Sequence, residues 1–446
     1  MIRSAQKTLK TVLATTTLAC STASFASMGN IGTTYGIMPL DVASAQGLSL
    51  FNSQVSATYY NPAALTKDPR GELATGILHA EHELKAASKG GPAAPVRKGD
   101  VLQNTPSQHV LVGMKTNVGS LTTLGIPVYL GFIAGVEKYG KEMLAFESET
   151  SPEGQFLEYG RQPLFLNLGG AAQVWRGVSA GYAARITLHA DASLQARSDL
   201  AGNTKYESLS VNAKPSIRSI FGVTMDLDET LCPESNCWFS GVEAALAYRT
   251  SSNTQTSVSA NMVIPGTIPE PGLSVNVMTL DAYQPEILSV GLQYSREKYR
   301  VALTLEQQNW SELSREFKKD TLKDQANIKF DDILITRIGA QYFLNESLSL
   351  IGGISFEKSP LKSDTSLDVN YFDNDRVVVG LGLSTTFNHT GIMAYPVQLD
   401  LGYQRHMLKK RSFDLAHGRH NGGDVYETVS AEGSVDVLSA SLTLKF

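Results

Sequence analysis

The sequence predicts an all-β protein: a 14-stranded antiparallel transmembrane β-barrel with an N-terminal hatch inside its lumen. Three observations lead to this prediction. Apolar and polar residues alternate with a period of two in many windows, which is typical of strands with one lipid-facing and one lumen-facing side. Long and short connections between these windows also alternate, as in barrels with short periplasmic turns and long outer loops. No stretch of the 446 residues approaches the ~18 apolar residues of a membrane-spanning helix.

Composition excludes several classes of protein. The chain has 38 Lys and Arg against 43 Asp and Glu, a formal net charge of -5, so it lacks the basic footprint of a nucleic-acid partner. Its three cysteines are too few for a small disulfide-built domain.

The first 26 residues resemble a secretory signal peptide. Arg3, Lys7 and Lys10 form a basic start, an apolar stretch follows over 11–19, and Ser24-Phe25-Ala26 places small residues where a signal peptidase reads. We expect cleavage after Ala26, and therefore export towards the outer membrane of a Gram-negative cell. The alternatives are a mitochondrial presequence and a lipoprotein signal at Cys20.

Residues 27–70 precede the first predicted strand and show no sustained alternation. They are rich in Gly, Ala, Ser and Asn, yet they contain Leu48, Leu50, Phe51, Tyr59 and Tyr60. Apolar side chains of this size favour a folded hatch in the lumen over the alternative, a disordered tail.

The barrel is predicted over 71–446, and its last strand is the clearest. Leu438, Ala440, Leu442, Leu444 and Phe446 alternate with polar residues up to the terminal aromatic. This ending resembles bacterial outer-membrane barrels, in which it signals to the barrel-assembly machinery; an ordinary sandwich edge strand is the alternative. The fourteen predicted strands are 71–84, 108–117, 124–136, 158–175, 177–194, 208–227, 239–253, 286–297, 299–310, 333–345, 348–359, 376–387, 397–408 and 435–446.

The segment from Ser56 to Leu65, SATYYNPAAL, resembles the Asn-Pro-Ala signature of the FadL-type outer-membrane transporters of long-chain fatty acids and other hydrophobic compounds. Further segments resemble the C-terminal half of that family: Pro285-Glu286-Ile287, Gln308-Asn309-Trp310-Ser311, Arg337-Ile338-Gly339 and Phe356-Glu357-Lys358-Ser359-Pro360.

This resemblance implies passive transport without a cofactor. A hydrophobic ligand, such as a long-chain fatty acid or a hydrocarbon, would enter through a groove in the outer loops, pass a hatch, and leave sideways through a gap in the wall. Asn61, Pro62 and Ala63 match the signature and are the expected gating residues; a simple turn before the first strand is the alternative. Outer-membrane lipid and lipopolysaccharide are the expected surroundings.

A lateral gap needs a strand that pairs poorly. Gly125 and Pro127 fall in the third predicted strand, where Pro127 cannot donate to the ladder and Gly131 weakens the strand further. We therefore predict the opening there, with Pro163 and Pro215 as competing positions. The expected ligand groove lies in the long loops, with candidate lining residues Met143, Leu144, Phe146, Phe317 and Leu322; a solvated loop face is the alternative.

Two sequence patterns resemble enzyme or metal sites. Gly177-Val178-Ser179-Ala180-Gly181 matches a nucleophile elbow but lies inside an alternating strand, whereas the elbow needs a strand, a sharp turn and a helix. We expect no enzyme, with a lipid esterase or phospholipase barrel and a general porin as alternatives. In His79-Ala80-Glu81-His82, a strand would point His82 away from the other two side chains, so no metal site is expected.

The remaining candidates lie in loops. His417, His420 and Asp424 belong to a glycine-rich outer loop that we interpret as solvated. Cys232 and Cys237 are close in sequence in an exported chain, which predicts a disulfide in a periplasmic turn.

Overall fold

The computed structural model describes residues 30–92, 96, 106–123, 125–138, 164–198, 204–232, 238–264, 268–318, 329–362, 373–388, 393–416 and 425–446. The predicted signal peptide and its cleavage site lie outside these residues. Among the helices in the described ranges, none is long and apolar enough to cross a membrane.

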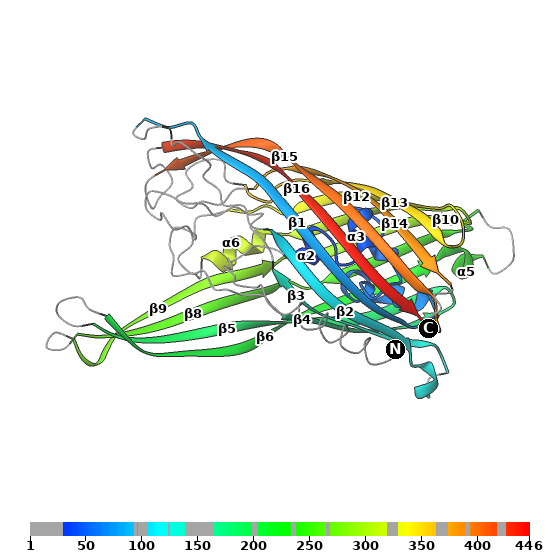
Figure 1. The fold of residues 1–446 in the computed structure, drawn as a ribbon, viewed down its shortest axis with the longest axis horizontal. Coiled ribbons are helices and arrows are strands. Elements are labelled where there is room, and N and C mark those ends of the chain that lie inside the picture. Colours follow the sequence, from blue (N-terminus) through cyan, green and yellow to red (C-terminus); the bar gives the residue numbers. More distant parts are fainter. Residues whose placement is uncertain are drawn as a thin grey trace, which may run out of the picture.

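Fourteen strands form a closed antiparallel barrel (Figure 1). The β1–β16 pair joins the two ends of the chain, and the β4–β5 pair completes the ring. The barrel strands are β1 (Glu72–Ser88), β2 (Ser107–Asn117), β3 (Val128–Lys138), β4 (Leu164–Trp175), β5 (Val178–Ser198), β6 (Thr204–Asp226), β7 (Val242–Arg249), β10 (Glu286–Arg296), β11 (Tyr299–Asn309), β12 (Ile333–Phe343), β13 (Leu348–Glu357), β14 (Arg376–Phe387), β15 (Val397–Ala416) and β16 (Val425–Lys445). All fourteen predicted strands are confirmed in order.

Two further strands were not predicted. β8 (Ser252–Ile264) and β9 (Ile268–Gln284) pair with each other as a hairpin, and β8 runs parallel to the outer part of β5. The hairpin projects from the barrel beside β5 and β6 (Figure 1). Pro269 and Pro271 lie within β9, and proline disfavours strands because it cannot donate to a ladder.

The barrel closes at its periplasmic end beside the C-terminus. Gly71 and Phe446 exchange two backbone hydrogen bonds, with N···O distances of 2.7 and 2.9 Å. The short helix α5 (Leu227–Leu231) and the 3₁₀ turn η3 (Gly119–Leu121) lie in connections at this end. The long connections leave from the opposite end, which we call the outer end.

Residues 30–67 form short helices inside the barrel (Figure 1). These are α2 (Ile31–Thr34), α3 (Pro39–Ala43), η1 (Ser49–Phe51), α4 (Ala57–Tyr60) and η2 (Pro62–Lys67). α3 contacts β13 to β16, whereas η2 contacts β3 to β6, so the segment touches opposite walls. Nearly all of its side chains are buried, so the segment lies packed inside the barrel, and we call it the hatch.

Side-chain caps set the ends of the hatch helices. Asn30 accepts a hydrogen bond from the Thr33 amide at 2.7 Å, and Asp41 accepts one from the Met38 amide at 3.0 Å. Pro39 and Pro62 each occupy a first helical position, where the fixed φ of proline is favourable. Such caps stabilise helices that are too short to be stable alone.

Candidate functional site

The hatch rests on a belt of inward-facing glycines. At each of these positions a β-carbon would come within 3.0 Å of a hatch atom. This contact is closer than real β-carbons make, so only glycine fits without a shift. The glycine belt comprises Gly113, Gly131, Gly181, Gly222, Gly291, Gly339, Gly353, Gly380, Gly382 and Gly402.

The Asn-Pro-Ala segment links the hatch to β5 and β6. Asn61 is fully buried; its Nδ2 donates to the Leu50 carbonyl at 2.9 Å, and its Oδ1 accepts from the Ala63 amide at 3.2 Å. A β-carbon at Gly181 would lie 2.6 Å from the Ala63 nitrogen. The segment thus ties η1 to η2 within the hatch and packs against the barrel strand β5.

The structure does not place Pro127 within a strand. β3 begins at Val128, so the predicted start at 124 is wrong, and Gly125 has a φ of +67° in the preceding turn. β3 is paired with β2 over residues 129–138 and with β4 over 128–136. Pro127 therefore interrupts no ladder in this conformation, because it lies just outside the pairing.

A charged ring lines the lumen on the outer side of the glycine belt. We define it as Glu137, Arg185, Arg218, Arg249, Glu306, Arg337 and Glu357, whose side chains are all nearly buried. Arg185 binds Glu137 at 2.7 Å, Arg249 binds Glu306 at 2.5 Å, and Arg337 binds Glu357 at 2.7 Å. Buried ion pairs of this kind are costly to break, because the remaining charge is stranded without water.

Arg218 lacks a carboxylate partner in the described part of the ring. Its guanidinium donates to the Thr250 carbonyl at 2.6 Å, to Gln284 Oε1 at 2.7 Å and to the Pro285 carbonyl at 2.6 Å. Each of the three guanidinium nitrogens thus donates one hydrogen bond at the junction between the barrel and the β8–β9 hairpin.

Tyr59 of the hatch contacts two arginines of the charged ring. The guanidinium carbons of Arg185 and Arg249 each lie 5.3 Å from the centre of its ring. Burial alone would raise the pKa of Tyr59, but the positive charges of Arg218, Arg249 and Arg185 outweigh it and lower the pKa. Tyr59 is thus a hatch residue that contacts the Arg185 and Arg249 guanidinium groups of the charged ring.

The polarity of the wall inverts towards the outer end. On β1, Leu73 and Ile77 face outwards, but beyond them His79 and Glu81 take the outer face while Leu84 and Ala86 are buried inside. On β16, Leu438 and Leu442 face outwards, whereas Val429 and Val435 are buried. The inversion marks where the wall leaves the membrane, because an exterior in water must be polar.

Buried apolar residues fill this outer part of the lumen. We call them the outer apolar cluster; it includes Leu84, Ala86, Trp310, Leu313, Phe330, Ile333, Ile335, Leu361, Phe413, Val429 and Val435, with Ile31, Tyr35 and Val42 of the hatch. Helix α6 (Ser311–Phe317) supplies Leu313.

β12 shows the three layers on one strand. Gly339 meets Leu48 of the hatch, Arg337 belongs to the charged ring, and Ile335 and Ile333 belong to the outer apolar cluster. From the periplasmic side outwards, the lumen thus contains a hatch, an ionic layer and an apolar layer.

Most predicted groove residues cannot be placed in these layers. Met143, Leu144, Phe146 and Leu322 lie outside the described residues, and Phe317 is the last residue of α6. Sequence reasoning missed Trp310, Phe413 and Val429. The available signal was the change of phase in the alternation, seen where Ile77 is followed by Leu78 and Val437 by Leu438.

The residues of the enzyme-like and metal-like sequence patterns make ordinary structural contacts where the structure describes them. Ser179 lies in β5 and its Oγ accepts a hydrogen bond from Thr66 of the hatch at 2.8 Å. His79 and Glu81 pair on the outer face at 3.0 Å while His82 is buried inside, as predicted. Cys232 is disulfide-bonded beside α5 in a periplasmic connection. Cys237, His417, His420 and Asp424 lie outside the described residues.

Comparison with known proteins gives consistent matches. Residues 242–446 match the family described as "Outer membrane protein transport protein (OMPP1/FadL/TodX)". Alkane uptake protein A of Marinobacter nauticus is 55% identical over 427 residues, covering 94% of this chain and 92% of that protein.

Two solved structures share the fold. A Pseudomonas aeruginosa FadL homologue superposes with a TM-score of 0.63 at 14% identity, covering 91% of this chain and 98% of that one. The toluene transporter TodX of P. putida gives a TM-score of 0.52 at 13% identity, covering 93% and 99%.

Proposed function

This chain belongs to the outer membrane protein transport family (OMPP1/FadL/TodX), and we propose that it carries long-chain alkanes passively across the outer membrane. The observation that carries the proposal is the outer apolar cluster above a hatch that fills the lumen. Apolar ligands gain roughly 0.8 kcal/mol per buried CH₂, so long alkyl chains are favoured. The name of the M. nauticus relative, alkane uptake protein A, supports the same ligand.

The charged ring favours a neutral ligand. Arg185, Arg249 and Arg337 already have carboxylate partners in the wall, and each nitrogen of the Arg218 guanidinium already donates to a neutral oxygen. A carboxylate ligand in this layer would add a negative charge next to the carboxylates of Glu137, Glu306 and Glu357, and it would lose its own hydration, which is costly in a buried site.

A long-chain fatty acid is the second candidate. Nη1 of Arg185 and both Nε and Nη1 of Arg249 are buried without a hydrogen-bond partner among the described groups. These donors could receive a carboxylate that reaches the ring, with its alkyl chain in the outer apolar cluster.

Release is proposed to occur sideways through the wall of β2 to β5, near the site predicted from Gly125 and Pro127. An apolar pocket of about 450 Å³ lies on the outer face there, between Leu130, Phe132, Leu168 and Tyr182. Behind it, a β-carbon at Gly131 would lie 2.9 Å from Thr58 of the hatch. One glycine backbone therefore separates the hatch from the lipid-facing side, and Asn61, Pro62 and Ala63 are the proposed gate beside it.

Uptake of labelled hexadecane and labelled palmitate by cells with and without the protein tests the proposal. We expect hexadecane uptake to depend on the protein, and palmitate uptake to depend on it less. Equal uptake with and without the protein would refute transport. Flux of soluble sugars through reconstituted protein would favour a general porin, and esterase activity abolished by Ser179→Ala would favour an enzyme.

A further inference from the structure

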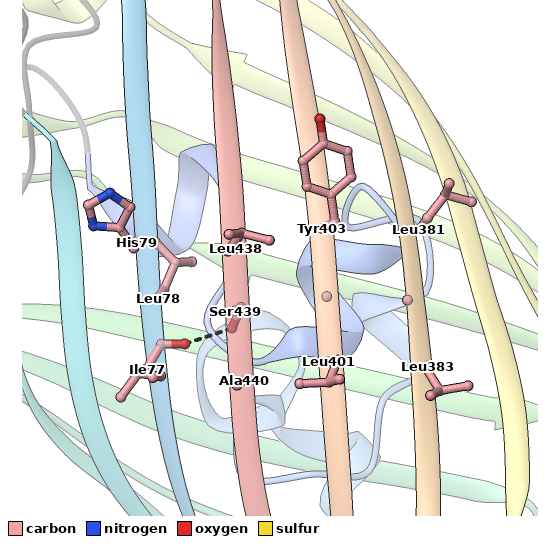
Figure 2. Close-up of a pocket in the computed structure, with 12 residues that line it drawn as sticks. Ile77, Leu78, His79, Leu381, Leu383, Leu401, Tyr403, Leu438, Ser439 and Ala440 are labelled. Carbon is pink, nitrogen blue, oxygen red and sulfur yellow. Dashed lines mark hydrogen bonds between the residues drawn. The ribbon is translucent and has the colours of Figure 1, made fainter.

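A second apolar groove lies on the outer face of the barrel, away from the proposed exit. It has a volume of about 490 Å³ and is formed by β14, β15, β16 and β1 (Figure 2). Its lining residues are Ile77, Leu78, His79, Leu381, Gly382, Leu383, Leu401, Gly402, Tyr403, Leu438, Ser439 and Ala440.

Strand register arranges the outward side chains in two rows across the wall. One row pairs Ile77 with Ala440, Ala440 with Leu401, and Leu401 with Leu383. The other row pairs His79 with Leu438, Leu438 with Tyr403, and Tyr403 with Leu381. The rows span three inter-strand spacings, roughly 14 Å, which suits an extended alkyl chain. Ala440 keeps the first row open, because its neighbours are all larger.

The groove is closed to the lumen. β14, β15, β16 and β1 are paired continuously past it, and on the inner side Gly402 and Gly382 abut Pro39 and Ala43 of the hatch. The groove therefore opens only to the membrane, and its occupant comes from the bilayer.

Polar groups border the groove at its outer edge. Tyr403 donates to Asp436 at 2.5 Å, and Arg405 donates to Asp436 at 3.1 Å and to Ser434 at 3.2 Å. At the opposite end of the apolar band, Tyr395 and Phe446 are exposed aromatics, which commonly mark a membrane interface. The groove thus lies in the half of the band next to the outer leaflet.

We propose that this groove seats an acyl chain of lipopolysaccharide, with the phosphorylated sugar head group against Arg405, Ser434 and His79. Three features match this lipid: the outer-leaflet level, the apolar slot, and a rim that offers a guanidinium for phosphate and both donors and acceptors for hydroxyls. Arg405 is half exposed, so a phosphate can share it with Asp436. Glu81 faces Asp436 across the β1–β16 pair and binds His79 at 3.0 Å, so the phosphate must approach from the Arg405 side of the rim.

Native mass spectrometry of the purified full chain in detergent tests the site. The protein is titrated with hexa-acylated, bisphosphorylated lipid A and, separately, with phosphatidylethanolamine. Ala440→Phe fills the slot, and Ala340→Phe places the same side chain on the outward face of β12, far from the groove. Arg405→Gln removes the rim cation.

We expect wild type and Ala340→Phe to retain one lipid A molecule. Ala440→Phe should weaken retention about tenfold, as the loss of a few buried methylene groups would, and Arg405→Gln should weaken lipid A but not phosphatidylethanolamine. Heat-modifiable migration on gels confirms that each variant is a folded barrel. Equal retention by Ala440→Phe would overturn the site, and equal retention of both lipids by wild type would overturn the assignment to lipopolysaccharide.

Discussion

Gly353 on β13 and Ser44 in the hatch are in backbone contact: a β-carbon at Gly353 would lie 2.8 Å from Ser44 Cα. The adjacent Gly352 points the other way, and a β-carbon there would meet nothing closer than 3.7 Å. Of these two neighbouring glycines, Gly353 faces the hatch and has no room for a side chain, whereas Gly352 faces the membrane and has room for one.

Gly353→Ala should therefore push the hatch from its seat, whereas Gly352→Ala should not. Overpacking of this kind costs about 1–3 kcal/mol, and a substitution with room for the methyl stays within about 0.5 kcal/mol. Guanidinium unfolding followed by tryptophan fluorescence gives the two free energies. Similar losses in both variants would contradict a hatch seated on glycines.

Asn61→Ala should loosen the hatch at the signature. The Leu50 carbonyl loses its donor and the Ala63 amide loses its acceptor, at about 1–3 kcal/mol for the buried group and about 1 kcal/mol for the cap. We expect faster proteolysis of the N-terminal segment and slower hexadecane uptake. Asn117→Ala removes a comparable turn bond to the Gly119 amide at the periplasmic end, and it should change neither; an effect as large as that of Asn61→Ala would count against a gating role.

Asp41 should make hatch stability depend on pH. Burial raises the pKa of this carboxyl above 3.8, against hydrogen bonds from Ser49 and the Met38 amide. A raised folded pKa means that the native state holds the proton more tightly, so this contribution is complete below pH 3.8 and is lost as pH rises through the folded pKa. Asp41→Asn cannot titrate. The unfolding free energy of wild type relative to Asp41→Asn should fall with rising pH, and a constant difference would contradict the assignment.

Leu84→Gln should reduce hexadecane uptake, because it puts an amide into the outer apolar cluster. Its neighbour Glu83 is exposed on the outer face of β1, so Glu83→Gln is the matched control and should leave uptake unchanged. Binding of labelled hexadecane to the purified variants separates ligand affinity from assembly. If Leu84→Gln binds and transports like wild type, the outer apolar cluster is not the binding region.

The fourteen strands were predictable because each has a period-two pattern and the connections alternate in length. The β8–β9 hairpin was not, since Pro269 and Pro271 interrupt the pattern of β9. The hatch was predictable as a buried segment from Leu48, Phe51 and Tyr60, but its seat depends on contacts between residues hundreds of positions apart, such as Gly353 and Ser44. No local pattern encodes such a contact.

The predicted start of the third strand at residue 124 shows another limit. Proline cannot donate a hydrogen bond to a β-ladder. Here no ladder bond is lost, because β3 begins one residue after Pro127, at Val128. The charged ring could not be predicted from the sequence either. Arg185, Arg249 and Glu306 lie on different strands, and only closure of the barrel brings them into one layer.

A disulfide between hatch and wall tests most directly whether transport needs the hatch to move. A β-carbon at Gly113 would lie 3.2 Å from Val55 Cβ, close to the ~3.8 Å of a disulfide, so Val55→Cys with Gly113→Cys should lock the hatch. Labelled hexadecane uptake is measured before and after reductant, with wild type and each single variant as controls. The account predicts that the oxidised lock blocks uptake and reduction restores it; uptake that is equally fast in the locked state would contradict passage through a moving hatch.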